Sequence, residues 1–276
     1  MSQYTVVDIP KTERITKLVN DLYAKLPEIE SDRAVLITES YRQTEGEPMI
    51  TRRAKAFEHI VKNIPITIRP GELIVGSATK APRGCQVFPE FSFEWLESEF
   101  DTVETRSADP FYISDKNKSI LHEVYKYWKG KTTSELATSY MAPEAILAIE
   151  HNMFTPGNYF YNGVGHVTVC YGEILAHGYE GIIAKAEAEL AKCKPGDADF
   201  AKRTHFLEAV IRSCKAAIFY AARYAELALN EAKACGDPVR KAELLQIAAN
   251  CARVPAKGAT TFYEACQSFW FVQMLL

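Results

Sequence analysis

The sequence contains no long hydrophobic run and no strong excess of either charge. Although 47% of its 276 residues are hydrophobic, no segment approaches the ~18 consecutive apolar residues that a membrane-spanning helix needs. The 32 basic and 35 acidic side chains leave a net charge of −3, which argues against nucleic acid or an anionic membrane as a partner. The first residues also lack a basic stretch leading into an apolar one, so we expect no secretory signal.

Paired cysteines are missing as well. The seven cysteines are odd in number, widely spaced and never in a C-x-x-C pair, which suits neither a zinc site nor a cluster site. We therefore expect no metal to be bound by this chain. Cys214 and Cys266 fall within apolar helical patterns, where a reduced cysteine behaves as a small hydrophobic residue. Unpaired cysteines of this kind are typical of a reducing compartment, so we expect a cytoplasmic location.

Most of the chain shows the periodicity of α-helices. Apolar residues recur at three- and four-residue spacing before Pro27, which places them on one helix face: Ile15, Leu18, Val19, Leu22 and Leu26. A short helix is expected after Pro143, because proline is favoured at the first helical position. Similar patterns predict helices over residues 31–46, 48–63, 114–128, 171–191, 197–235 and 237–251.

Two capping boxes predict further helix starts. Thr132 with Glu135 begins a helix over residues 133–140, and Thr261 with Glu264 begins one that runs to the last residue. The final run Phe269–Leu276 is apolar on nearly every side and carries no stop signal such as glycine or proline. Such a run predicts burial against more protein. We therefore expect the chain to be an N-terminal fragment of a longer protein.

Strands are expected to be few. Residues 64–71 should be extended, because each proline disfavours helix in the residue before it, and Glu72–Gly76 is predicted to be a short strand. Residues 77–112 form a long aromatic-rich loop region of the kind that often lines a site or an interface. No repeat and no flexible linker divides the chain. The sequence thus predicts one mainly α unit with a few short strands over residues 1–276, without an internal boundary.

The segment from Asn158 to Cys170 is the most informative for function. Three aromatic residues precede Asn162, and two glycines, Gly163 and Gly165, stand immediately before a single histidine, His166. Glycine lets the backbone turn sharply and lets other groups approach it closely. A histidine after such a turn can point into a cavity, although a hydrogen-bonded histidine on a buried turn is the ordinary alternative.

Several stretches of the chain resemble the glycyl radical enzymes. The general resemblance rests on residues 73–76 and 262–270, and residues 30–40, 63–76, 85–91 and 254–255 extend it over nearly the whole chain. The block from Thr132 to His166 is most similar to the B12-independent glycerol and 1,2-propanediol dehydratases of that family. The resemblance implies that the chain is the N-terminal, mainly helical part of a pyruvate formate-lyase-like ten-stranded α/β barrel, inside which the radical loops meet.

The resemblance also implies a reaction and its partners. In such carbon–oxygen lyases of anaerobic metabolism, an activating enzyme with an iron–sulfur cluster and S-adenosylmethionine places a radical on a glycine. The radical passes to a cysteine, whose thiyl removes hydrogen from a diol, and water then leaves to give an aldehyde. His166 matches the family's histidine that contacts the substrate hydroxyls, and Asn158 matches a neighbouring polar position. These enzymes are usually homodimers, and packaging in a bacterial microcompartment stays open.

The motifs that carry the radical are absent from this chain. It has neither a Gly-Cys-Val-Glu-like loop for the thiyl cysteine nor a loop for the radical glycine. Cys85 follows a glycine, but Gln86 and Val87 come next, and no carboxylate stands where the base should be. We therefore assign no catalytic residue and no bound cofactor to the chain, and we expect it to be inactive alone.

Two other interpretations stay open. The first is another glycyl radical eliminase, acting on choline, hydroxyproline or isethionate. The block around His166 argues against it, because a cationic or sulfonated substrate would need other pocket groups. The second is a non-catalytic helical scaffold from a truncated gene, whose terminal helix would expose an apolar surface able to pair with another subunit.

Other polar residues are weaker candidates. His59 lies between Glu58 and Lys62 in a helical pattern, which indicates a solvated helix face. The pair at residues 52–53 is expected to form ordinary surface ion pairs. Glu90, after Pro89, is a candidate for a cavity or interface residue without a motif to support it.

Overall fold

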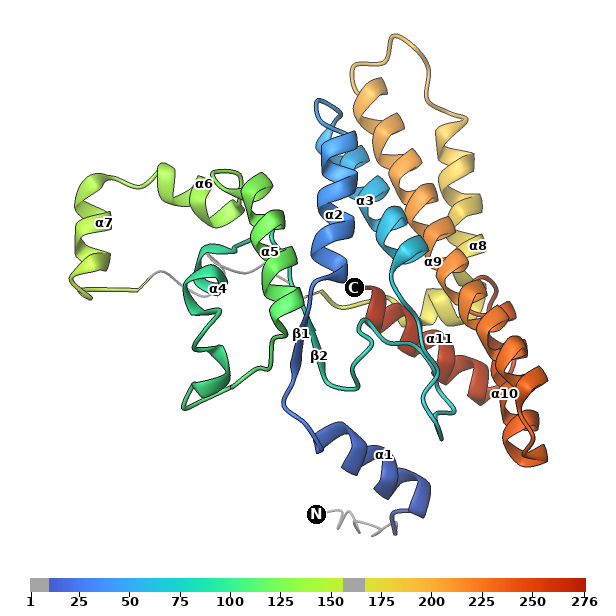
Figure 1. Ribbon diagram of the computed structural model, residues 1–276. Coiled ribbons are helices and arrows are strands. Elements are labelled where there is room, and N and C mark those ends of the chain that lie inside the picture. The colour runs from blue at the N-terminus through green and yellow to red at the C-terminus, as the bar shows by residue number, and fades with distance from the viewer. Residues whose placement is uncertain (1–9, 156–166) are drawn as a thin grey trace, which may run out of the picture.

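The computed structural model describes residues 10–155 and 167–276 and is mainly helical (Figure 1). Its helices are α1 (Glu13–Tyr23), α2 (Asp32–Gln43), α3 (Met49–Asn63), α4 (Glu94–Glu99), α5 (Asp115–Trp128), α6 (Thr133–Ser139), α7 (Pro143–Glu150), α8 (Tyr171–Leu190), α9 (Phe200–Ala234), α10 (Pro238–Arg253) and α11 (Phe262–Leu275). A 3-10 turn covers Val103–Thr105, and the strands are β1 (Glu28–Glu30) and β2 (Gly84–Gln86). The predicted fold class, mainly α with a few short strands, is confirmed. In the ranges described, no helix has the length and apolar character that crossing a membrane would require.

The larger core is organised around α9, which packs against α3, α8 and α10 (Figure 1). One face of α9 is made of small residues together with two tyrosines, Tyr220 and Tyr224, and this face is buried. Small side chains let neighbouring helices approach closely, and the two aromatic rings fill the remaining space. Tyr224 and Phe271 of α11 have ring centroids 5.7 Å apart, so the last helix closes this core.

A second, smaller core lies between α2, α4 and α5; in Figure 1, α4 and α5 lie to the left of β1, away from α9. Phe93 is fully buried and stacks on Tyr125 with ring centroids 4.8 Å apart. The indole nitrogen of Trp128, at the end of α5, donates a hydrogen bond to the Thr38 hydroxyl of α2 at 2.8 Å. This core therefore packs residues 92–128 against α2.

The strands β1 and β2 form a parallel pair in which Ile29 stands opposite Cys85. The side chain of Glu30 is buried, and its carboxylate accepts backbone hydrogen bonds from Lys80 at 3.0 Å and Ala81 at 2.7 Å. The loop before β2 is therefore fixed by a side chain of β1. This pairing was not among the strands expected from the sequence.

The predicted strand at residues 72–76 is wrong. The segment forms no strand among the described residues, and side chains bind its backbone instead. Gln267 of α11 accepts a hydrogen bond from the Val75 amide at 2.9 Å and donates one to the Val75 carbonyl at 2.7 Å. The Trp270 indole donates to the Gly76 carbonyl at 2.9 Å. The position of this segment thus depends on α11.

The next residue of this segment, Ser77, is held from α9 in the same manner. The Ser77 amide donates to the Tyr224 hydroxyl at 3.0 Å, and the Tyr220 hydroxyl donates to the Ser77 carbonyl at 2.9 Å. Buried backbone groups need partners, and here all of these partners are side chains. We call residues 73–77 together with these side chains the side-chain-bound segment.

The two capping boxes differ in outcome. The box at Thr132 is confirmed, because Thr132 accepts from the Glu135 amide and Glu135 accepts from the Thr132 amide. At the start of α11 only one half forms as predicted: Thr261 accepts from the Glu264 amide at 3.2 Å. The Glu264 carboxylate instead accepts from the amide of Thr260, at 2.7 Å. The start of α11 was predicted correctly. The Glu264 carboxylate, however, binds the amide of the residue before Thr261 and not the amide of Thr261 itself.

Candidate functional site

The residues predicted to bind substrate, His166 and Asn158, lie outside the residues that the structure describes. What the structure shows is the framework on either side of their segment. The chain enters it after α6 and α7 and leaves it through residues 167–170 into α8. The positions of α7 and α8 therefore define where the segment of His166 and Asn158, called the candidate segment, joins the rest of the chain.

The beginning of α8 is attached to the last helix. The ring of Tyr171 packs on that of Phe269 with centroids 4.5 Å apart, and its hydroxyl donates to Gln273 at 2.6 Å. Val167 is 65% exposed and Cys170 is exposed as well. The chain thus leaves the candidate segment beside α11, on a face that no described residue covers.

Helix α8 is broken at Gly178, whose φ of 64° and ψ of −176° are outside the helical range. A side chain there would overlap the backbone of Ala256, and one at Gly258 would overlap the carbonyl of Ala176. The two backbones are joined by hydrogen bonds, since Tyr179 donates to the Pro255 carbonyl at 2.8 Å. Glycine is the residue that tolerates both the angles and the approach. The loop at residues 255–259 therefore sets the direction of residues 171–177.

The start of α6 is attached to the start of α4. Hydroxyls of Thr132 and Ser134 donate to the carboxylate of Glu94, at 2.8 Å and 3.2 Å. Burial alone would raise the pKa of this carboxyl, but hydrogen bonds from its own amide, that of Phe93 and the two hydroxyls lower it. Glu94 is thus an ionised structural group, and it is unsuited to act as a general acid near neutral pH.

A cavity of about 320 Å³ lies between α2, α3 and the end of α11. Glu90, a candidate for a cavity or an interface, is among the residues that line it. Its carboxylate, however, pairs with Arg33 through two hydrogen bonds, of 3.1 Å and 2.5 Å. The same guanidinium stacks on Phe88 at 3.6 Å from the ring centroid. Both charged groups already have partners, so this cavity contains a structural ion pair.

The weaker candidates are structural as well. His59 lies 2.9 Å from the Glu39 carboxylate on the helix surface, in agreement with a solvated face. Arg52 differs from the predicted surface ion pair, because it donates to the Tyr41 carbonyl at 2.9 Å and stacks on that ring. Arg53 lines the cavity described above.

The cysteines described by the structure are all free thiols. Burial raises the pKa of Cys214 to about 11 and that of Cys251 to about 12, and it also raises the pKa of Cys85. Thiols with raised pKa values are poor nucleophiles at neutral pH. Within residues 10–155 and 167–276, no group of three or more His, Cys, Asp or Glu side chains is arranged to hold a metal ion.

Sequence reasoning missed two features of this framework. The break at Gly178 lies inside a convincing helical pattern, and only the glycine itself signals it. The docking of Tyr171 on α11 joins residues about a hundred positions apart, for which one sequence gives no signal.

Residues 9–276 match the model of the pyruvate formate lyase-like family, so the chain belongs to that family. The chain is 60% identical, with a TM-score of 0.94 over 99% of its length, to a structure solved for 1,2-propanediol dehydration in Roseburia inulinivorans. It is 53% identical, with a TM-score of 0.93 over 97% of its length, to the glycerol-bound B12-independent glycerol dehydratase of Clostridium butyricum. A curated relative, the isethionate sulfite-lyase of Desulfovibrio desulfuricans, is 34% identical over 95% of the chain.

The chain is much shorter than these proteins. It covers 32% of the Roseburia protein, 34% of the Clostridium enzyme and 32% of the isethionate sulfite-lyase. The chain thus spans about a third of the length of the relatives it matches.

Proposed function

We propose that this chain is the N-terminal third of a glycyl radical diol dehydratase that converts glycerol or 1,2-propanediol to the corresponding aldehyde and water. The observation that carries the proposal is the 60% and 53% identity to the two diol-processing proteins, against 34% to the isethionate sulfite-lyase. The contrast supports a diol over a sulfonate as the substrate.

The radical glycine and the thiyl cysteine belong, in this proposal, to the remaining two thirds of the protein, where the activating enzyme acts. The contribution of this chain is substrate binding. His166 and Asn158 would hold the two hydroxyls through donor and acceptor atoms. Fixed hydroxyls matter because a misplaced radical would attack the wrong C–H bond.

The framework of the described residues supports this role. The chain leaves the candidate segment through exposed residues such as Val167 and then becomes fixed at Tyr171. Elimination through a radical requires a site closed to solvent. Closure would have to come from further protein, which is why we expect the chain of 276 residues to show no dehydratase activity by itself.

The first experiment is an intact mass of the natural product together with the reading frame beyond Leu276. A mass far above 31.0 kDa supports the proposal. The complete protein, activated without oxygen, should then dehydrate glycerol and 1,2-propanediol and should leave isethionate unchanged. Release of sulfite from isethionate would assign the protein to the other eliminases, and a mass of 31.0 kDa would favour the non-catalytic scaffold.

The second experiment tests the assigned residue. In the complete enzyme, His166→Ala should lower turnover by about 100-fold or more, because a positioned histidine typically contributes that much. The glycyl radical signal in electron paramagnetic resonance should be unchanged. The matched control is His59→Ala, on the helix surface beside Glu39, which should keep turnover. Normal turnover in His166→Ala would remove this residue from the site.

A further inference from the structure

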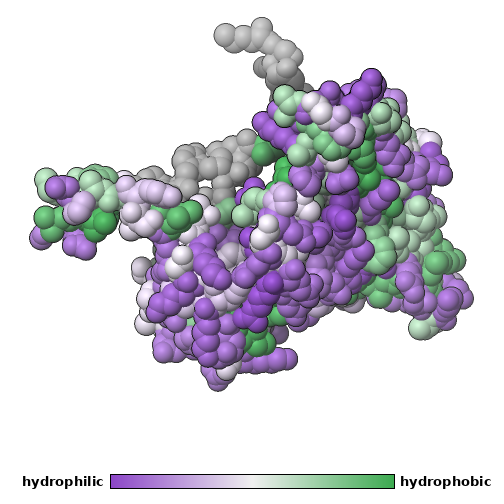
Figure 2. Space-filling view, turned by 90° about the horizontal axis from the view of Figure 1, so that it is seen from above, coloured by the Kyte–Doolittle hydropathy of each residue, from purple (hydrophilic) through white to green (hydrophobic). Residues whose placement is uncertain are grey.

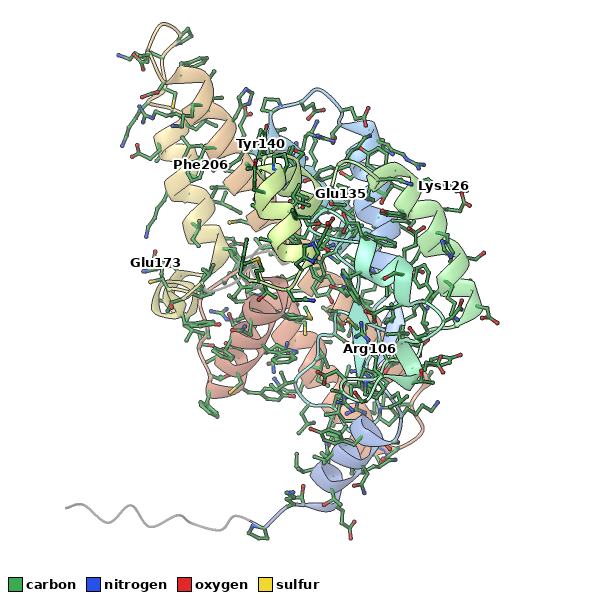
Figure 3. All side chains as sticks on the ribbon, turned by 90° about the vertical axis from the view of Figure 1, so that its left-hand side faces the viewer. Arg106, Lys126, Glu135, Tyr140, Glu173 and Phe206 are labelled. Atoms are coloured by element: carbon green, nitrogen blue, oxygen red, sulfur yellow. The ribbon has the colours of Figure 1, made fainter. Side chains whose placement is uncertain are left out.

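The first helix, α1, lies at the edge of the molecule, at the bottom of Figures 1 and 3. Its apolar residues follow one helix face, but none of the side chains of α1 is buried. Ile15 is 45% exposed and Val19 is 37% exposed. A helix of 11 residues is marginal in water without packing of an apolar face, because nucleation is unfavourable. The stability of α1 therefore depends on the contacts that attach it to the rest of the chain.

Charged groups hold both ends of α1. At its start, the Arg14 guanidinium pairs with the carboxylate of Glu243 on α10 and donates to the Gly71 carbonyl at 3.3 Å. At its end, the ring of Tyr23 lies 5.3 Å from the guanidinium of Arg83. The attachment of α1 is thus mainly electrostatic.

The turn that Arg14 binds has a second cationic partner. Arg240 of α10 donates to the carbonyls of Arg69 and Glu72, at 3.3 Å and 2.8 Å. It also donates to the carboxylate of Glu243 at 3.0 Å. Both the turn and this carboxylate therefore keep a partner when Arg14 leaves. Separation of α1 does not require any other element to unfold.

Ion pairs of this kind respond to salt, whereas the contacts of the core do not. Hydrophilic residues cover much of the face seen in Figure 2, and charged side chains are common on this molecule. Helix α9 is nevertheless held by buried small and aromatic side chains, whose contacts salt does not screen. The side chains of Arg14 and Glu243 are 35% and 19% exposed, so dissolved ions screen their attraction.

We propose that α1 is a latch held by ion pairs, which rising ionic strength releases from α10. In the closed state Arg14 joins α10 to the turn at Gly71. In the open state α1 has separated and unfolded, while the helices around α9 stay folded. The latch gives the beginning of the chain two states whose balance is set by the screening of charge. The inference is independent of the proposed substrate.

Hydrogen exchange on the complete protein tests the inference without any substitution. Between about 0.05 M and about 1 M sodium chloride, the amides of residues 16–23 should exchange about 3-fold or more faster. Those of residues 216–228 in α9 should be unaffected. A peptide of residues 10–25 in the same buffers corrects for the effect of salt on exchange itself. Exchange in α1 that is indifferent to salt would overturn the inference, and so would exchange as slow as that of α9.

A pair of matched substitutions identifies the group that holds the latch. Glu243→Gln keeps the shape of the side chain but removes its charge, so α1 should exchange about 3-fold or more faster at low salt. Added salt should then have little further effect. Asp21→Asn removes the same charge from the exposed surface of α1 and should keep the salt response. Unchanged exchange and salt response in Glu243→Gln would contradict the latch.

A second variant covers the case in which Glu243→Gln disturbs α10, where Arg240 shares the carboxylate. Exchange along α10 in the same spectra reports such a disturbance. Arg14→Gln leaves the pair between Arg240 and Glu243 in place and should release α1 alone. Protection of α1 that survives Arg14→Gln would overturn the inference.

Discussion

The helical body around α9 and residues 133–155, which we call the arm, differ in how far their apolar side chains are buried. In the body, α9 buries a whole face against α3, α8 and α10, and the fully buried Ile247 of α10 lies in that core. On the arm, Leu147 has a similar size but is 54% exposed. The body is therefore stabilised by its own contacts, whereas the arm is not. The comparison teaches that the chain contains a well-packed core and, beside it, apolar side chains that the described residues leave largely exposed.

The largest expected effect concerns the side-chain-bound segment. Gln267→Ala removes both partners of Val75 and leaves two buried backbone groups unsatisfied. At about 1–3 kcal/mol for each group, we expect a loss of about 3 kcal/mol or more in the free energy of unfolding, measured with urea. Gln273→Ala, on the same helix, removes one exposed bond to Tyr171 and should cost less than about 1 kcal/mol. Equal losses would show that the segment is not held by Gln267.

The next effect concerns the break in α8. Gly178→Ala requires a side chain in a backbone region that is open mainly to glycine, and it would overlap Ala256. We expect a loss of about 2–3 kcal/mol in the free energy of unfolding. Gly172→Ala is the control, because a side chain there meets nothing within 4 Å. That variant should be neutral or slightly stabilising, since alanine favours helix. An unaffected Gly178→Ala would mean that the break is not required.

A smaller effect follows from the buried thiols of the body. Burial raises the pKa of Cys251 from 9.0 in the unfolded chain to about 12 in the folded one. The folded thiol keeps its proton as pH rises above 9, while the unfolded thiol loses it, so stability is complete below pH 9 and falls above it. By linkage, ionisation of this thiol in the unfolded chain should lower the free energy of unfolding by about 2 kcal/mol at about pH 10.5.

The measurement is the urea midpoint at about pH 8 and pH 10.5, compared with Cys251→Ala. The variant should lose less stability over the same pH interval than the unaltered chain. An identical loss in both would assign the alkaline destabilisation to other buried groups, such as Tyr179, whose pKa burial raises to about 12.

The smallest effect should come from the arm. In the chain of 276 residues, Leu147→Ala shortens a side chain that is largely exposed and should change the free energy of unfolding by less than about 0.5 kcal/mol. Ile247→Ala in the body should cost about 2–5 kcal/mol, because it leaves a cavity. A comparable loss at both positions in urea denaturation would show that the arm packs on the body and would remove the contrast between them.

The sequence was sufficient for the helices because their signals are local. The capping box at Thr132 and the start of α10 at Pro238, with Asp237 before it, are formed by neighbouring residues. The strand at residues 72–76 failed for the opposite reason. Its β-like pattern is real, but its partners are side chains such as Gln267, which lies 192 positions away from Val75. A single sequence cannot predict such a partner.

The candidate site shows the same limit. The glycines before His166 predicted a turn and the resemblance supplied a role, but both concern residues outside the described part of the chain. The attachment of the site could not be predicted, because it depends on long-range contacts such as Tyr171 with Phe269 and on the approach of Gly178 to Ala256. The assignment of His166 and Asn158 therefore stays a prediction.

The bond between Gln267 and Val75 has a consequence for the order in which the protein is made. Val75 leaves the ribosome long before Gln267 is synthesised, and its amide and carbonyl must stay hydrated until α11 emerges. Contacts of such sequence separation are formed late and slow the folding of a chain. The helices from α2 to α10 can assemble during synthesis, but we expect residues 73–77 to become ordered only when the last helix has been made. Completion of this core is thus timed by translation of residues 262–275.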